Sequence, residues 1–211
     1  MENKQIRNLN LFNGDNMEYM KDIPDKYYDL AVVDPPYGIG ITQSGRLKKY
    51  NSENTSWDNS IPNKDYFDEL FRISKNQIIW GANYFLDYLC ATKCFLIYDK
   101  KQPQGVSFAS CELAWTSFCG VAKTFYYSPM QMKDRIHSCQ KPIKLYEWIY
   151  LNYAKRGDKI IDTHLGSGSS AIAAYNVNMD LNFDGIEIDK EYFDKSIKRI
   201  EELTREQSLF G

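Results

Sequence analysis

Residues 159–168 read KIIDTHLGSG, and this stretch decides the fold class of the chain. Its apolar half has the length of a buried strand that ends at Asp162, and the glycines that follow lead into a helical segment at 169–176. A second apolar segment at 183–187 completes a strand–helix–strand unit. Such units build parallel sheets covered by helices on both faces, so the stretch predicts an α/β domain.

Short apolar segments alternate with longer amphipathic ones along the rest of the chain, as in an open α/β sheet. The candidate strands are residues 9–13, 29–33, 77–80, 94–98, 112–116, 124–127, 159–162 and 183–187. The candidate helices are residues 17–22, 64–73, 83–89, 142–154, 169–176 and 190–205. We expect one domain over residues 1–211, with a seven-stranded, mostly parallel sheet and one antiparallel strand near an edge. Residues 38–62, 99–110 and 128–141 are expected as loops.

The composition argues against some functional classes. With 26 Lys and Arg against 28 Asp and Glu, the chain lacks the basic surplus of most DNA-binding domains, so contacts to nucleic acid must come from local clusters. The five cysteines show no CxxC spacing and only two histidines are present, which predicts reduced thiols and no metal site. The N-terminal residues contain no apolar signal segment, and no apolar run approaches about 18 residues. These absences predict a soluble, unexported, cytoplasmic protein without membrane contact.

A carboxylate, two prolines and a tyrosine follow the apolar segment Leu30–Val33, as Asp34-Pro35-Pro36-Tyr37. Open α/β sheets bind their ligands at the carboxyl ends of such strands. The prolines stiffen the backbone and keep their carbonyl acceptors, and Tyr37 adds an aromatic face. Two acceptors that accept hydrogen bonds from both N–H groups of an exocyclic amine would localise its nitrogen lone pair, while the ring stacks on a base that has left the duplex. The alternative interpretation is a rigid diproline turn with a half-buried tyrosine.

The loop after Asp162 is the candidate cofactor site. Gly166, Ser167 and Gly168 lead into the helix, and Glu187 lies about 20 residues further on, where a carboxylate binds a ribose diol. A dinucleotide site is the rival interpretation, because the glycines also fit a GxGxxA pattern. It is disfavoured because a carboxylate at the strand end repels a pyrophosphate but attracts an ammonium or sulfonium cation. A glycine turn that only packs a helix on a strand is the structural alternative.

In this order and spacing, the motifs resemble the β-class, circularly permuted DNA amino-methyltransferases over almost the whole chain. Besides the two motifs above, the resemblance rests on the segments Asn13–Asp15, Gln77–Tyr84, Tyr98–Lys100, Glu112–Trp115, His137–Pro142 and Gly185–Glu187. It implies a Rossmann-like methyltransferase domain in which residues 1–136 carry the target-base site and recognition loops and residues 137–211 bind the cofactor. The implied cofactor is S-adenosylmethionine, and the implied reaction is methyl transfer to N6 of a flipped adenine in DNA.

The resemblance also implies roles for individual residues. The residues that hold and activate the base are Asp34, Pro35, Pro36 and Tyr37. The cofactor-binding residues are Asp15, Asp34, His137, Gln140, Lys141, Asp162, His164, Leu165, Gly166, Ser167, Gly168 and Glu187. Asp15 is expected at the adenine amino group of the cofactor, and Gln140 and Lys141 at its amino-acid end. His164 stands where the family often has phenylalanine and is expected to pack over the cofactor.

Double-stranded DNA is the expected partner, contacted by Arg46, Lys48, Lys49, Lys133 and Arg135. For residues 46–49, a solvated charge run is the alternative. A homodimer and a cognate restriction enzyme stay open as further partners, in a bacterial or phage-infected cell. N4 of cytosine, RNA, and a non-catalytic DNA- or cofactor-binding subunit are the alternative functions. Within the resemblance, an aspartate at position 34, rather than a serine, favours adenine.

Overall fold

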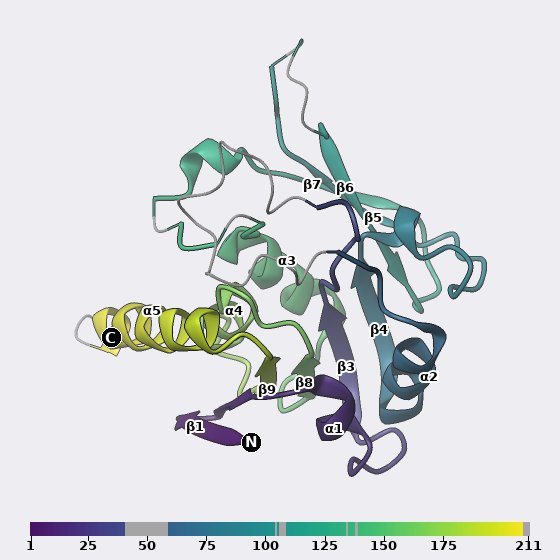
Figure 1. Cartoon of the computed structure of the whole chain (residues 1–211). Coiled ribbons are helices and arrows are strands. Elements are labelled where there is room, and N and C mark those ends of the chain that lie inside the picture. Colours follow the sequence, from purple (N-terminus) through teal and green to yellow (C-terminus); the bar gives the residue numbers. More distant parts are fainter. Residues whose placement is uncertain (41–58, 104, 106–108, 134, 138, 209–211) are drawn as a thin grey trace.

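The computed structural model describes residues 1–40, 59–103, 105, 109–133, 135–137 and 139–208. The expected DNA contacts Arg46, Lys48 and Lys49 therefore lie outside the described residues. Figure 1 shows one α/β domain in which helices pack on both sides of a central sheet. Within the described residues, no helix is long and apolar enough to cross a membrane.

The sheet of the described chain has nine strands in the order β1-β2-β9-β8-β3-β4-β6-β5-β7. Their bounds are β1 (Glu2–Ile6), β2 (Leu9–Asn13), β3 (Tyr28–Val33), β4 (Ser74–Trp80), β5 (Leu96–Asp99), β6 (Cys111–Thr116), β7 (Lys123–Tyr126), β8 (Lys159–Asp162) and β9 (Asn182–Glu187). The strands β2, β9, β8, β3 and β4 pair in parallel, as do β5 and β7. β6 runs antiparallel to its neighbours β4 and β5, and β1 runs antiparallel to β2 at the edge.

The α/β class and the mostly parallel sheet are confirmed, but the expected seven strands with one antiparallel member are wrong. All eight candidate segments form strands, and β1 is added at the edge. Four of the five β1 residues are exposed, so this strand has no buried face and no apolar alternation that could reveal it in the sequence. The antiparallel strand β6 lies inside the sheet, between β4 and β5, rather than near an edge.

The five described α-helices match five of the six expected ones. They are α1 (Asn16–Met20), α2 (Lys64–Ile73), α3 (Ile143–Tyr153), α4 (Ser169–Asn176) and α5 (Lys190–Ser208). The helix expected at 83–89 is wrong, because only a 3-10 turn forms there, at Ala82–Tyr84. Phe85 is fully buried against Phe67, and Tyr88 stacks on the same ring, so tertiary packing and not helical periodicity places these aromatic residues.

Two hydrophobic clusters cover the two faces of the sheet, and β3 contributes to both. Leu30 and Val32 belong to the cluster formed with α3, α4 and α5, whereas Ala31 and Val33 belong to the cluster formed with α1 and α2. All four side chains are buried, as expected for a central parallel strand with helices on both faces. This packing on both faces fixes the end of β3, where Asp34 begins.

Because most strands are parallel, the segments that follow them meet at one edge of the sheet. Asp34 follows β3, Gly81 follows β4 and Lys100 follows β5. Residues 163–168 follow β8, and Glu187 is the last residue of β9. The antiparallel β6 begins at this same edge, so its second residue, Glu112, lies opposite Tyr98 near the end of β5.

Candidate active site

A cavity of about 760 Å³ lies at this edge of the sheet. Its size falls within the range of small-molecule and cofactor sites. It is lined at one end by Asp34, Tyr37 and Glu112, and at the other by Gly166 and Glu187. The two motifs that the sequence analysis selected therefore open into one continuous space, which is the first requirement for a reaction between two bound molecules.

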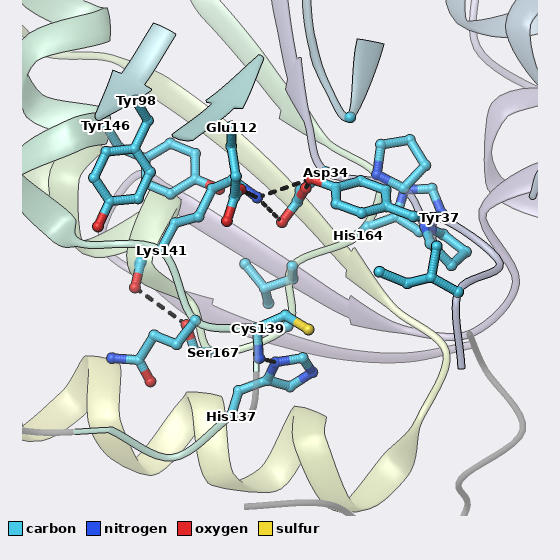
Figure 2. A pocket seen from close by; sticks show the side chains of 18 of the residues that line it. Asp34, Tyr37, Tyr98, Glu112, His137, Cys139, Lys141, Tyr146, His164 and Ser167 are labelled. Carbon is cyan, nitrogen blue, oxygen red and sulfur yellow. Dashed lines mark hydrogen bonds and ion pairs between the residues drawn. The ribbon is translucent and has the colours of Figure 1, made fainter. Parts of the chain in front are cut away.

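Asp34 stands at the centre of a hydrogen-bonded group. Its Oδ1 accepts a bond of 2.6 Å from the Tyr37 hydroxyl, and its Oδ2 lies 2.5 Å from the Lys141 ammonium. Lys141 also donates to the Tyr37 hydroxyl at 3.2 Å. Figure 2 shows Lys141, which comes from the residues before α3, meeting the Asp34 and Tyr37 side chains of the segment after β3. The sequence analysis expected Lys141 near the amino-acid end of the cofactor, whereas its ammonium binds the carboxylate of the base-binding motif.

The Tyr37 ring is held by a glycine and a second tyrosine. Gly81 has a φ of 76°, and a Cβ atom there would lie 2.2 Å from the Tyr37 ring. This position therefore needs glycine both for its left-handed backbone and for the approach of the ring. On another side, Tyr84 stacks on Tyr37 with 4.9 Å between the ring centroids and an angle of 14°. Tyr84 is 40% exposed, so the stacked pair leads from the cavity to the surface.

Lys141 lies between two carboxylates. Its ammonium is 2.9 Å from Glu112 Oε2, and the other Glu112 oxygen is 2.7 Å from the Lys100 ammonium. Asp34, Lys141, Glu112 and Lys100 thus form a chain of alternating charge whose formal sum is zero. The side-chain exposures are 3% for Lys141, 18% for Asp34 and 22% for Glu112, so the middle of the chain has little contact with water. Buried charges persist only when paired in this way.

The protonation states follow from burial and from these neighbours. Burial raises the pKa of Asp34, and Glu112 adds to that effect while Lys141 opposes it. Burial acts against the charge of Glu112, but Lys141 and Lys100 outweigh it and lower the pKa of Glu112 to about 2. Burial likewise disfavours the Lys141 ammonium, but Asp34 and Glu112 outweigh it and raise the pKa of Lys141 above its usual value. Lys141 and Glu112 are therefore both charged at neutral pH.

The glycine loop after β8 wraps around the carboxylate of Glu187. Gly166 N donates to Glu187 Oε2 at 2.8 Å, and Asp189 N donates to Oε1 at 2.9 Å. Gly166 has a φ of 52°, and among the described residues beyond its two chain neighbours a Cβ atom there would meet only the His164 carbonyl oxygen within 4 Å, at 3.9 Å. The backbone is therefore open toward the cavity at this point. Leu165, Ser167 and Glu187 also line the cavity.

Asp162 and Gly168 organise this loop from behind the cavity wall. Asp162 is 1% exposed and accepts bonds from Ser170 Oγ at 2.5 Å and from His164 N at 3.0 Å. Burial raises the pKa of Asp162 to about 7, and it raises that of Glu187 to about 7 as well. A Cβ atom on Gly168 would lie 2.8 Å from Ile200, so this glycine allows α5 to pack against the loop. Neither Asp162 nor Gly168 lines the cavity.

Both histidines of the chain lie in the cavity wall and are neutral. The His164 ring nitrogens lie 3.0 Å from Thr163 Oγ1 and 3.2 Å from Asn16 Nδ2. His137 Nδ1 accepts a bond of 3.0 Å from Cys139 N, and its ring packs 4.3 Å from the ring of Tyr192. Burial lowers the pKa of each histidine to about 3. These contacts give the histidines packing and orienting roles.

The remaining expected site residues occupy different positions. Gln140 lines the cavity, and its side-chain oxygen accepts a bond of 2.9 Å from Ile136 N. Arg135 also lines the cavity, whereas Lys133 is exposed outside it. Asp15 caps α1 by accepting a bond of 2.7 Å from Met17 N, and it lies outside the cavity lining.

Local sequence patterns do not mark Glu112, Lys100 or Tyr84 as site residues. Glu112 occurs in the quoted segment 112–115, but nothing local distinguishes it from an ordinary strand glutamate. The sequence feature that could point to this charged group is the position of Lys100, directly after the end of an expected strand. Its pairing with Glu112 depends on β6 lying beside β5, which local patterns do not specify.

Comparison with known proteins agrees with this geometry. A family model described as DNA methylase, of the N6 and N4 type, matches residues 59–199. The Type II methyltransferase M.HinfI of Haemophilus influenzae is 28% identical over 92% of this chain, which spans 68% of that relative. The Type II methyltransferase M2.DpnII of Streptococcus pneumoniae is 40% identical over 78% of this chain and 55% of its own length.

Solved structures show the same fold. The M1.HpyAVI–SAM complex superposes with a TM-score of 0.64 at 19% identity, covering 91% of this chain and 98% of that one. The cytosine-N4-specific PvuII DNA methyltransferase gives a TM-score of 0.64 at 12% identity, over 95% and 93% of the two chains. The resemblance expected from the sequence motifs is thereby confirmed. The chain belongs to the N6/N4 DNA methylase family, whose model matches it from residue 59 to residue 199.

Proposed function

We propose that this protein transfers a methyl group from S-adenosylmethionine to N6 of adenine in double-stranded DNA, with the target base flipped out of the duplex. One observation carries the proposal. The Asp34-Pro35-Pro36-Tyr37 motif and the glycine loop with Glu187 line the same cavity of about 760 Å³. An acceptor group for an amine and a cofactor site therefore share one enclosed space, as direct transfer between two bound molecules requires.

The cofactor half of the cavity suits S-adenosylmethionine. The open backbone at Gly166 and the buried carboxylate of Glu187 would hold the adenosine part, and each Glu187 oxygen keeps a lone pair beyond its single backbone bond. The bound cofactor would supply a methyl group on a positively charged sulfur. The buried acid Asp162, behind the wall, adds negative potential that favours a cation over a phosphate.

On the base side, Asp34 and the Pro35 carbonyl would each accept a hydrogen bond from one N–H of the target amino group and so localise its lone pair. The stacked Tyr37–Tyr84 pair would guide the base from the surface into the cavity. Attack on the methyl group would be direct, without a covalent enzyme intermediate. Orientation and acceptors placed where positive charge develops on nitrogen would supply most of the rate enhancement.

The preference for adenine rests on Asp34 and on no feature of the fold. The fold also superposes on the cytosine-N4-specific PvuII enzyme with a TM-score of 0.64, so the fold alone does not select adenine. In the family that the motifs resemble, an aspartate at this position usually accompanies adenine. Lys133 and Arg135 would contact DNA near the cavity mouth, where Arg135 belongs to the lining. The Type II designation of the relatives supports a cognate restriction enzyme in a bacterial cytoplasm, and a homodimer stays a prediction.

Nucleoside mass spectrometry on unmethylated DNA incubated with S-adenosylmethionine tests the proposal. We expect N6-methyladenine with the wild-type protein and none with Asp34→Ala, while the variant still binds the cofactor. N4-methylcytosine would overturn the assignment of the base and leave the transfer intact. Product formation by Asp34→Ala would overturn the role of Asp34. Cofactor binding without a methylated product on DNA or RNA would favour a non-catalytic subunit.

A further inference from the structure

The Asp34 carboxylate that the proposed reaction needs as an acceptor is already engaged in this structure. Tyr37 donates to one oxygen at 2.6 Å, and the Lys141 ammonium lies 2.5 Å from the other. A full positive charge at that distance withdraws electron density from the oxygen and weakens it as an acceptor. It also opposes the positive charge that develops on the target nitrogen during transfer. The proposed function therefore requires the charge of Lys141 to be offset or displaced.

The Lys141 ammonium cannot move to water, because its side chain is only 3% exposed. Among the described residues, its ion pairs are with Asp34 and Glu112. Glu112 Oε2 lies 2.9 Å from the ammonium, so a small shift toward Glu112 lengthens the contact with Asp34 without leaving the cation unpaired. Lys100 is bound to the other Glu112 oxygen at 2.7 Å and fixes that carboxylate in place.

We propose that Glu112 is a positioning residue that gives the Lys141 ammonium a second carboxylate partner, so that Asp34 is released to accept the target amino group. The inference rests on the proposed function. It assigns Glu112 no contact with the base or the cofactor, since it acts through Lys141. Lys100 has a supporting role, because it holds Glu112 at the position that Lys141 reaches.

The position of Glu112 in the fold supports this role. β6 runs antiparallel between two strands that run the other way, so its beginning lies at the edge where β4 and β5 end. A residue near its start can therefore face the cavity from a rigid sheet rather than from a loop. The charged and titratable groups that interact with Asp34 come from several elements: Lys141 before α3, Glu112 on β6, Tyr37 in the segment of Asp34 itself, Asp162 on β8, Tyr146 on α3 and Tyr66 on α2.

The test compares Glu112→Gln with Glu147→Gln. The second variant is the matched control, because Glu147 on α3 also pairs with a lysine, Lys144, at 2.7 Å, but it does not line the cavity. We expect Glu112→Gln to lower kcat by about tenfold or more, the factor that equals one pKa unit of lost electrostatic interaction. The dissociation constant for S-adenosylmethionine should be unchanged. Glu112→Asp should recover part of the loss. Glu147→Gln should behave as wild type.

The pH profile separates positioning from a folding defect. The negative charge of Glu112 raises the pKa of Asp34, so removing it lowers that pKa. Since Asp34 must be ionised to accept the amine, the acid limb of kcat should move to lower pH in Glu112→Gln. The Asp34 carboxyl, followed by carbon NMR in the free protein, should titrate at lower pH as well. The second readout needs no turnover, so it holds even if the substrate assignment is wrong.

The outcomes distinguish a failure of the proposed function from a failure of the role of Glu112. Wild-type protein that methylates no nucleic acid overturns the proposed function. Wild-type activity together with a Glu112→Gln variant that matches Glu147→Gln in kcat and in the Asp34 titration overturns the role of Glu112. If Glu112→Gln does not fold, Lys100→Met replaces it, because the Lys100 side chain is 16% exposed at the end of the charge chain. Its kcat should then fall by a smaller factor in the same direction, and an unchanged kcat would overturn the proposal.

Discussion

The two ends of the cavity both bury carboxylates, and they stabilise them by different means. At the base side, formed by Asp34, Tyr37, Lys141, Glu112 and Lys100, lysine ammonium groups pair with the carboxylates. At the cofactor side, formed by residues 162–168 and Glu187, backbone amides and a serine hydroxyl bind them. The consequence appears in the protonation states. Glu112 has a pKa lowered to about 2, whereas Glu187 has a pKa raised to about 7.

This difference suits the two proposed tasks. Glu112, paired with two lysines, keeps its charge at any physiological pH and can serve as a fixed partner for Lys141, while Asp34, whose pKa burial raises, is the acceptor. A carboxylate that is buried without a cation is poised to lose its proton when a cation arrives. The base side thus holds its carboxylates in ion pairs, whereas the printed contacts of Asp162 and Glu187 within the described residues come from backbone amides and a serine hydroxyl, and the one buried arginine near this loop, Arg199, binds the Ser167 carbonyl.

Replacement of Lys141 should have the largest effect, because it removes the cation that the two carboxylates of the base side share. Lys141→Met leaves Asp34 and Glu112 as neighbouring buried carboxylates without their shared cation, so we expect a loss of about 3–5 kcal/mol in the free energy of unfolding and loss of methyl transfer. Urea denaturation and product assays measure the two effects. The control is Lys75→Met, whose ion pair with Asp29 is screened by water and should contribute little to stability. Equal losses in both variants would contradict the proposed electrostatics.

Gly81 tests whether the base side also depends on close packing. Gly81→Ala should lower the free energy of unfolding by about 3 kcal/mol more than Gly157→Ala, because its Cβ would lie 2.2 Å from the Tyr37 ring. Gly157 has a φ of 82°, similar to the 76° of Gly81, and a Cβ there would meet nothing within 4 Å. The backbone strain is therefore matched, and thermal denaturation of both variants isolates the ring contact. Similar midpoints would show that Tyr37 moves aside at little cost.

On the cofactor side, the stability of the protein should depend on the protonation of Glu187. Its pKa is raised to about 7 in the fold, so at low pH the carboxyl is neutral and costs nothing. As the pH rises above the unfolded-state pKa, the unfolded chain ionises first and the folded state loses stability until about pH 7. Glu187→Gln lacks this loss. Relative to wild type, the variant should gain about 2 kcal/mol between pH 5 and pH 7.5 in chemical denaturation. A pH-independent difference would contradict the raised pKa.

The smallest expected effect is on cofactor affinity, and it tests whether the acids of the cofactor side, unlike Glu112, are partly protonated before the ligand binds. A cation bound near Glu187 and Asp162 favours their ionised forms, whose pKa values are about 7 in the free protein. Binding of S-adenosylmethionine should therefore release protons. Its affinity should rise by about fivefold between pH 6 and pH 8 if the bound cation lowers one of these pKa values from about 7 to about 6. Calorimetry in buffers of different ionisation enthalpy measures the release. Proton uptake on binding would reverse the assignment of these acids.

Local sequence patterns predicted the elements of the fold well where a buried face was present. β3 and α4 were located because their apolar residues occur at the spacing of a strand or a helix. β1 was missed because it is an exposed edge strand, and residues 83–89 were misassigned because aromatic side chains in a tertiary cluster imitated a helical spacing. In the site, Asp34 was selected for its place at a strand end and Glu187 for its spacing from the glycines, and both line the cavity. Asp162 was correctly located at a strand end, but its contacts turn away from the cavity.

The sequence by itself determined the α/β class, the family and the strand-end positions of Asp34 and the glycine loop, because each of these depends on residues that are neighbours in the chain. Only the tertiary structure decided what those groups contact. Lys141 pairs with Asp34 across 107 residues, and Glu112 joins them because β6 lies antiparallel between β4 and β5. The physical reason is that hydrogen bonds and ion pairs depend on distances of a few ångströms, and strand order, which local periodicity does not encode, sets those distances.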